Sequence, residues 1–133
     1  RWSEDPGGLH PTVQEMHKAN GLFAECAAAD DFYSPNKLEA EALAFLKQYE
    51  EVESPMCGST IGFDRAFLRE HMPALEECFT YRNLDCSVFT EIARRWYPEA
   101  YASRPQQAKG HRALDDIRVS VALLKHWRAT VLR

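Results

Sequence analysis

The hydrophobic residues of this chain recur mostly at steps of three and four, the spacing of one face of an α-helix. The clearest stripe runs from Leu38 to Tyr49 and follows the helix-start sequence Ser34-Pro35-Asn36. Shorter stripes predict further helices near residues 13–19, 22–29, 64–72, 88–96 and 114–124. Helices therefore dominate the predicted structure.

Two short segments, residues 56–58 and 81–85, predict strands instead, and residues 98–110 predict a loop. Residues 1–11 hold two prolines and two glycines without a pattern, so we expect an irregular lead-in to one domain over residues 12–133. The resulting order is helices, strand, helix, strand, helix, loop, helix. It predicts an α/β fold with very little sheet.

The same patterns predict which faces are buried. On the last helix, an apolar stripe of Leu114, Ile117, Val121 and Leu124 is expected to face the core. We assign Trp96 to the core as well, since it continues the apolar face of residues 88–96.

Composition excludes several classes of function. The net charge of −4 and the pI near 5.7 argue against a protein that grips long duplex nucleic acid through a basic face. A ligand with few phosphates stays compatible with this charge. The sequence contains no apolar run long enough to cross a membrane.

Carboxylates stand at two predicted helix starts, Asp64 after one Gly-containing turn and Asp115-Asp116 after another. Brought together, such carboxylates would hold hard cations such as Mg²⁺ or Mn²⁺, with His111 as a base for an attacking water. A structural explanation is also open. Acidic residues in a first turn complement the helix dipole, and Arg112 could pair with Asp116.

A longer stretch resembles a known family. The sequence CGSTIGFDRAFLREHMPALEECFTYRNLDCSVFTEIARRW, followed by GHRALDDIRVSVALL and preceded by MHKANGL and LEAEALAFLKQY, is similar to oligoribonuclease. That family consists of DEDDh-type 3′→5′ exoribonucleases that degrade very short RNA to mononucleotides. The resemblance implies a ribonuclease-H-like exonuclease fold, usually a homodimer, with short single-stranded RNA as substrate.

The resemblance also implies roles for individual residues. Asp64 in GFDRAFL and Asp116 in HRALDD match metal-binding aspartates, and His111 matches the general base. Asp115 would then be a supporting neighbour. The positions that match substrate-contacting residues are Thr60, Arg82 and Ser87 for a terminal phosphate, Tyr81 for an aromatic residue contributed by the partner subunit, and His17 on the substrate side. Ser87 is also predicted to be the N-cap of the helix that follows it.

The chain departs from the family pattern in its first part. The Asp-x-Glu strand expected well before MHKANGL is absent, since the only acidic cluster there is Ser3-Glu4-Asp5-Pro6, and Thr12 replaces an aromatic residue. The opening strands of the fold are missing with it, which predicts a mostly helical structure with a small residual sheet. Two Mg²⁺ or Mn²⁺ ions are expected only if other residues supply the missing carboxylates.

The sequence leaves two alternative functions open. One is an exoribonuclease that needs an Asp-x-Glu segment from elsewhere, and the other is an inactive relative that serves as a structural or assembly subunit of a larger complex. The family is compatible with a cytoplasmic or a mitochondrial location.

Overall fold

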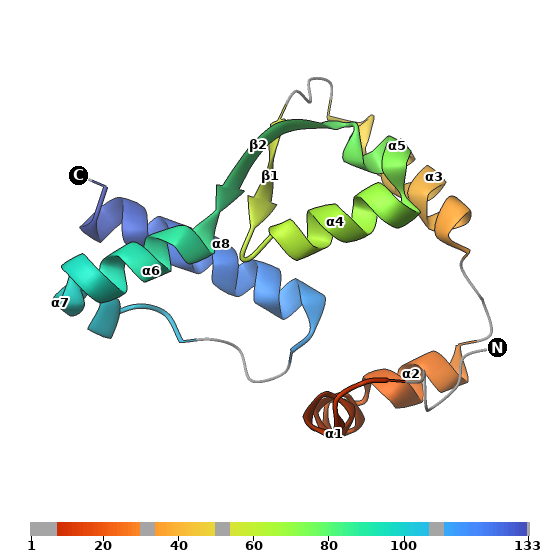
Figure 1. The fold of residues 1–133 in the computed structure, drawn as a ribbon, viewed down its shortest axis with the longest axis horizontal. Helices are drawn as coiled ribbons and strands as arrows, with labels where there is room; N and C mark the ends of the chain where they lie inside the picture. Colours follow the sequence, from red (N-terminus) through yellow and green to blue (C-terminus); the bar gives the residue numbers. More distant parts are fainter. Residues whose placement is uncertain (1–7, 30–33, 50–53, 107–110, 133) are drawn as a thin grey trace.

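The computed structural model describes residues 8–29, 34–49, 54–106 and 111–132. The elements along the chain are α1 (Pro11–Ala19), α2 (Leu22–Ala28), α3 (Pro35–Leu46), β1 (Ser54–Gly58), α4 (Gly62–His71), α5 (Pro73–Glu76), β2 (Phe79–Asp85), α6 (Cys86–Trp96), α7 (Pro98–Ala102) and α8 (Ala113–Thr130). Figure 1 shows how these elements are arranged. The described chain is mostly helical, as the sequence predicts.

The sheet of the described residues consists of two parallel strands, β1 and β2. Met56 lies opposite Asn83 and Gly58 opposite Asp85, and the pairing is irregular between Ser54 and Met56. Helices α4 and α5 form the crossover between the strands (Figure 1). Such a crossover is what a parallel pair requires, because a tight hairpin can join only antiparallel strands.

The core lies where the ends of the strands meet α6 and α8, which pack against each other. Its buried apolar side chains are Met56, Ile61, Cys86, Ala93 and Trp127. Trp127, near the end of α8, is fully buried and is the largest of them. This small core packs α8 against α6 and β1.

Helices α1 and α2 form a hairpin that contacts the start of α8. Gly21 joins the two helices with φ of 79°, in the left-handed region that glycine adopts without strain. The Asn20 side-chain amide donates to the His111 carbonyl oxygen at 3.4 Å, and Glu25 forms an ion pair with Arg112. The Arg112–Asp116 pair suggested by the sequence is therefore wrong, since the Arg112 guanidinium contacts Glu25 across this interface.

Several local predictions are confirmed and others are wrong. The Ser34 hydroxyl caps α3 by accepting from the Lys37 amide at 3.3 Å. The predicted loop over residues 98–110 instead begins with α7, because Pro98 suits the first turn of a helix. Trp96 is 69% exposed, so its assignment to the core is wrong. The side chain of Trp96 faces solvent, although Ala93, three residues earlier on α6, is buried.

The first three residues of the apolar stripe of α8 are also exposed rather than buried, and Leu124 is half-buried. Leu114 is 66% exposed, Ile117 57% and Val121 49%, whereas Trp127 on the same helix is fully buried. Among the described residues, no element covers the first half of this stripe. The pattern predicts the helix correctly, but the sequence does not reveal which half of the stripe the rest of the described chain covers.

Candidate active site

Asp64 and Asp116 come from distant parts of the sequence and line the same groove. Asp64 stands in the first turn of α4 and Asp116 in the first turn of α8. The groove has a volume of about 620 Å³, and its lining includes Met56, Ile61, Asp64, Asp116, Ser120 and Val121. We call this space the carboxylate groove. The structure thus brings together the two aspartates that the sequence singled out.

A pair of hydroxyl groups connects the segments that carry these aspartates. Ser59, just before α4, hydrogen bonds through its hydroxyl to the hydroxyl of Ser120 on α8 at 3.0 Å. The Ser120 hydroxyl also donates to the carbonyl oxygen of Asp116 at 2.9 Å. This link holds α8 beside the start of α4 and so fixes how the two carboxylates approach each other.

The neighbouring carboxylates Asp115 and Asp116 differ in their surroundings. Asp116 lines the carboxylate groove, whereas Asp115 does not and instead accepts from Arg118 at 2.8 Å. Successive residues on a helix point in different directions, which separates two acidic groups that are adjacent in sequence. This difference is consistent with the predicted division into a metal ligand and a supporting neighbour.

His111 lies outside the carboxylate groove. It directly precedes Arg112, the N-cap residue of α8, has φ of 46° and is exposed. Its carbonyl oxygen accepts from Asn20, so the α1–α2 hairpin holds its backbone. The structure does not bring His111 against Asp64 or Asp116, and its role as a base stays a prediction.

Asp85 connects the loop before α4 to the start of α6. Its Oδ1 accepts from the Thr60 amide at 2.9 Å, the Ser87 amide at 2.9 Å and the Ser87 hydroxyl at 2.7 Å, and its Oδ2 accepts from the Ile61 amide at 3.1 Å. Burial raises the pKa of Asp85, but the hydrogen bonds from Ser87, Thr60 and Ile61 outweigh it and hold the pKa below its ordinary value.

Asp85 is therefore the N-cap of α6, and the prediction that Ser87 is the cap is wrong. Ser87 lies inside the first turn of α6 and donates both its amide and its hydroxyl to the cap residue. Neither Thr60 nor Ser87 lines the carboxylate groove; Ser87 borders a separate hollow on α6 with Glu91 and Arg95. The two predicted phosphate contacts meet at Asp85 instead.

Tyr81 and Arg82 lie side by side on β2 and are exposed. Tyr81 is 82% exposed, and the Arg82 guanidinium carbon lies 5.1 Å from the centre of its ring. This arrangement is a cation–π contact at the surface. The Arg82 side chain is thus accessible to an anion, but no described contact joins it to Thr60 or Ser87.

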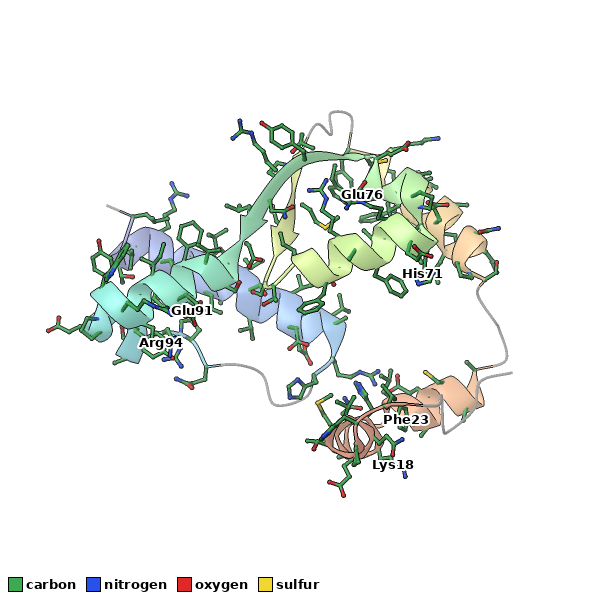
Figure 2. The ribbon with its side chains drawn as sticks, viewed as in Figure 1. Lys18, Phe23, His71, Glu76, Glu91 and Arg94 are labelled. Carbon is green, nitrogen blue, oxygen red and sulfur yellow. The ribbon has the colours of Figure 1, made fainter. Side chains whose placement is uncertain are left out.

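His17 lies in the last turn of α1, on the hairpin that contacts His111. Its ring centre is 5.6 Å from that of Phe23, which Figure 2 labels on α2. The Nδ1 atom of His17 is buried without a hydrogen-bond partner among the described residues. The structure places this predicted substrate-side residue outside the carboxylate groove.

Similarity to known proteins identifies the family of this chain. The model of the exonuclease family matches residues 4–124, nearly the whole chain. The chain belongs to the exonuclease family. Its mostly helical structure with a two-stranded parallel sheet is the ribonuclease-H-like exonuclease architecture with the reduced sheet that the sequence predicts.

Curated relatives of this exonuclease-family chain carry the name oligoribonuclease, which confirms the resemblance found in the sequence. The protein from Streptomyces avermitilis is 42% identical over 121 residues, which are 90% of this chain and 59% of the relative. Those from Alkalilimnicola ehrlichii and Dichelobacter nodosus are 52% and 46% identical, over 71% and 89% of this chain and 49% and 63% of each relative. The chain spans less than two thirds of the length of each.

The carboxylates of this exonuclease-family chain do not by themselves fit a two-ion metal centre. Hard divalent cations need several oxygen ligands each, and the carboxylate groove offers Asp64 and Asp116. Across residues 8–29, 34–49, 54–106 and 111–132, no three or more His, Cys, Asp or Glu residues are grouped so as to hold a metal. Further ligands would have to come from outside these residues.

Sequence reasoning missed Arg65, an extensively hydrogen-bonded side chain next to Asp64 on α4. It is 8% exposed, donates to Glu76 at 2.7 Å and to the Asn83 side chain at 2.7 Å, and reaches the Thr80 carbonyl oxygen at 2.5 Å. Figure 2 labels Glu76, on α5. Because Arg65 hydrogen bonds to Glu76, the pKa of that carboxyl lies below its ordinary value. Arg65 thereby fastens α4, and with it Asp64, to β2.

Proposed function

We propose that this chain is part of a 3′→5′ exoribonuclease that hydrolyses very short single-stranded RNA, dinucleotides upward, to nucleoside monophosphates. The observation that carries the proposal is that Asp64 and Asp116 line one groove although they belong to distant helices. Membership of the exonuclease family and the similarity to proteins named oligoribonuclease support the same activity.

The chemistry assigns a separate task to each group. Asp64 and Asp116 would be two of the carboxylate ligands for Mg²⁺ or Mn²⁺, and an Asp-x-Glu segment outside the described residues would supply the others. Bound divalent cations activate the attacking water and stabilise the leaving oxygen in phosphoryl hydrolysis. His111 would accept the proton of that water at a ring nitrogen, which requires its side chain to turn toward the groove.

The residues predicted to contact the substrate are not among those that line the carboxylate groove. Thr60, Arg82 and Ser87 would bind a terminal phosphate, and the exposed Tyr81 would reach the substrate held by the partner subunit of a homodimer. His17 would approach the substrate from the α1–α2 hairpin.

We propose one exonuclease-like domain over residues 12–133, in the cytoplasm or a mitochondrion. None of the helices in the described ranges has both the length and the apolar character needed for a membrane crossing.

One observation favours the second candidate, a non-catalytic assembly subunit of a larger complex. The described residues provide the carboxylate groove with only two of the metal ligands that catalysis needs. A subunit without catalytic function would retain the exposed apolar surfaces of α8 and α6 for contacts with other proteins.

Hydrolysis of a labelled dinucleotide in Mg²⁺ or Mn²⁺ separates the two candidates. We expect the protein isolated from its own cells, with any polypeptide that copurifies, to release mononucleotides. The variants D64N and D116N should each lower the rate at least about a hundredfold, because each loses a ligand charge. D115N is the matched control, since it removes the adjacent charge outside the groove, and it should retain most of the rate. Equal losses for D115N and D116N, or no hydrolysis at all, would favour the subunit without catalytic function.

A further inference from the structure

One oxygen atom joins the two residues that the proposed function places at a terminal phosphate. Oδ1 of Asp85 accepts from the Thr60 amide at 2.9 Å and from the Ser87 hydroxyl at 2.7 Å. The Thr60 amide and the Ser87 hydroxyl therefore lie on either side of a single carboxylate oxygen. The two residues are far apart in the sequence, and this contact sets their relative position.

The same carboxylate holds an unfavourable backbone conformation. Thr60 has φ of 60°, in the left-handed region that a β-branched residue rarely occupies. Its amide and that of Ile61 donate to the two oxygens of Asp85 at 2.9 and 3.1 Å. The turn is also tight, since a Cβ on Gly58 would lie 2.5 Å from Cγ2 of Ile61. Two charge-assisted hydrogen bonds thus hold Thr60 in a conformation that its own side chain disfavours.

The Thr60 hydroxyl stays available in this arrangement. Thr60 is exposed, and within the described part of the chain no hydrogen bond engages its hydroxyl group. The Ser87 hydroxyl, in contrast, is engaged by Asp85. Of these two hydroxyls, that of Thr60 is therefore the one free to donate to an anion, provided that Asp85 keeps the turn in place.

We propose that Asp85 is a positioning residue that presents the Thr60 hydroxyl to the terminal phosphate of a short RNA. The proposal rests on the proposed function, because that function supplies the phosphate. Asp85 does not bind the phosphate itself, since both groups are negatively charged. Its carboxylate acts through the Thr60 and Ile61 amides on one side and through Ser87 on the other.

The variant D85N tests this role because charge and positioning predict opposite results. Loss of a negative charge alone would strengthen the binding of a phosphate. Loss of positioning should instead weaken it, because asparagine puts an NH2 group in place of one of the two accepting oxygens, so that the Thr60 and Ile61 amides cannot both keep their acceptor. We expect the affinity for a dinucleotide with a terminal phosphate to fall about tenfold, the loss typical of one hydrogen bond to a charged group. Affinity for the same dinucleotide without that phosphate should stay unchanged.

Binding is measured by calorimetry without divalent cation, so that hydrolysis does not interfere. Glu70→Gln is the matched control: it removes one exposed negative charge from α4 and should leave the ratio of the two affinities as in the parent. An unchanged or higher affinity for the phosphorylated dinucleotide in D85N would overturn the proposal. An equal loss for both dinucleotides would overturn it too, because it would indicate general damage to the fold.

Hydrogen exchange of the Thr60 and Ile61 amides provides a readout that does not depend on RNA. Both amides should exchange faster in D85N and at the parental rate in E70Q; unchanged protection in D85N would refute the positioning role. If the parent protein binds neither dinucleotide, the proposed function fails. The exchange measurement then decides alone whether Asp85 holds the turn.

Discussion

Two regions of the molecule differ in how many partners the described chain gives their side chains: the surroundings of Arg65 on α4, and the carboxylate groove that α4 and α8 line. Around Arg65, a buried guanidinium meets a carboxylate, a side-chain amide and backbone carbonyls, so nearly every donor has a partner. Along the carboxylate groove, Ile117 and Val121 remain half exposed beside Asp64 and Asp116. The first region is complete within the described chain. The second is the region where the proposed function requires substrate, metal ions and further carboxylates.

The largest expected effect contrasts the two ends of α8. Trp127→Ala should lower the free energy of unfolding by about 4 kcal/mol, because a large, fully buried side chain leaves a cavity. Ile117→Ala should lower it by less than about 1 kcal/mol, since 57% of that side chain already faces solvent. Urea unfolding monitored by circular dichroism measures both. Similar losses would show that the groove face is covered in the protein as it exists in solution.

A second, smaller effect concerns the two arginines that contact Glu76. Arg65→Met should cost about 3 kcal/mol of unfolding free energy, because it leaves a carboxylate and several carbonyl groups without their buried partner. Arg69→Met removes an exposed arginine that contacts the same carboxylate at 3.2 Å and should cost about 0.5 kcal/mol or less. Equal costs would contradict the account of Arg65 as the residue that fastens α4 to β2.

The smallest effect is the pH dependence contributed by Asp85. Its pKa in the folded chain lies below the ordinary value of 3.8, so its contribution to stability is present above that value and is lost as the pH falls through the folded pKa. The parent should therefore be more stable than D85N near neutral pH, and this difference should shrink in acid. Thermal unfolding at a series of pH values measures it. A difference that stays constant down to strong acid would show that the charge of Asp85 is not what stabilises the turn.

The sequence was sufficient to predict the longer helices, because their apolar periodicity is local information, but it missed the short α7. It also predicted the pairing of Asp64 with Asp116 in one site through the resemblance to oligoribonuclease. It could not predict the environment of Arg65 or Asp85, since their partners lie on other elements and leave no periodic signal. Trp96 and Ile117 were misplaced for a related reason: a stripe shows that a face is apolar, but tertiary contacts decide whether anything covers it.

We propose that the two aspartates of the carboxylate groove act only together with an Asp-x-Glu segment, which these 133 residues do not contain. The most direct test is to determine the intact mass and N-terminal sequence of every polypeptide in a preparation that hydrolyses a dinucleotide. We expect an Asp-x-Glu segment in this chain's own longer form or in a copurified polypeptide. An active preparation that contains only these 133 residues, or an inactive one in which that segment is present, would contradict it.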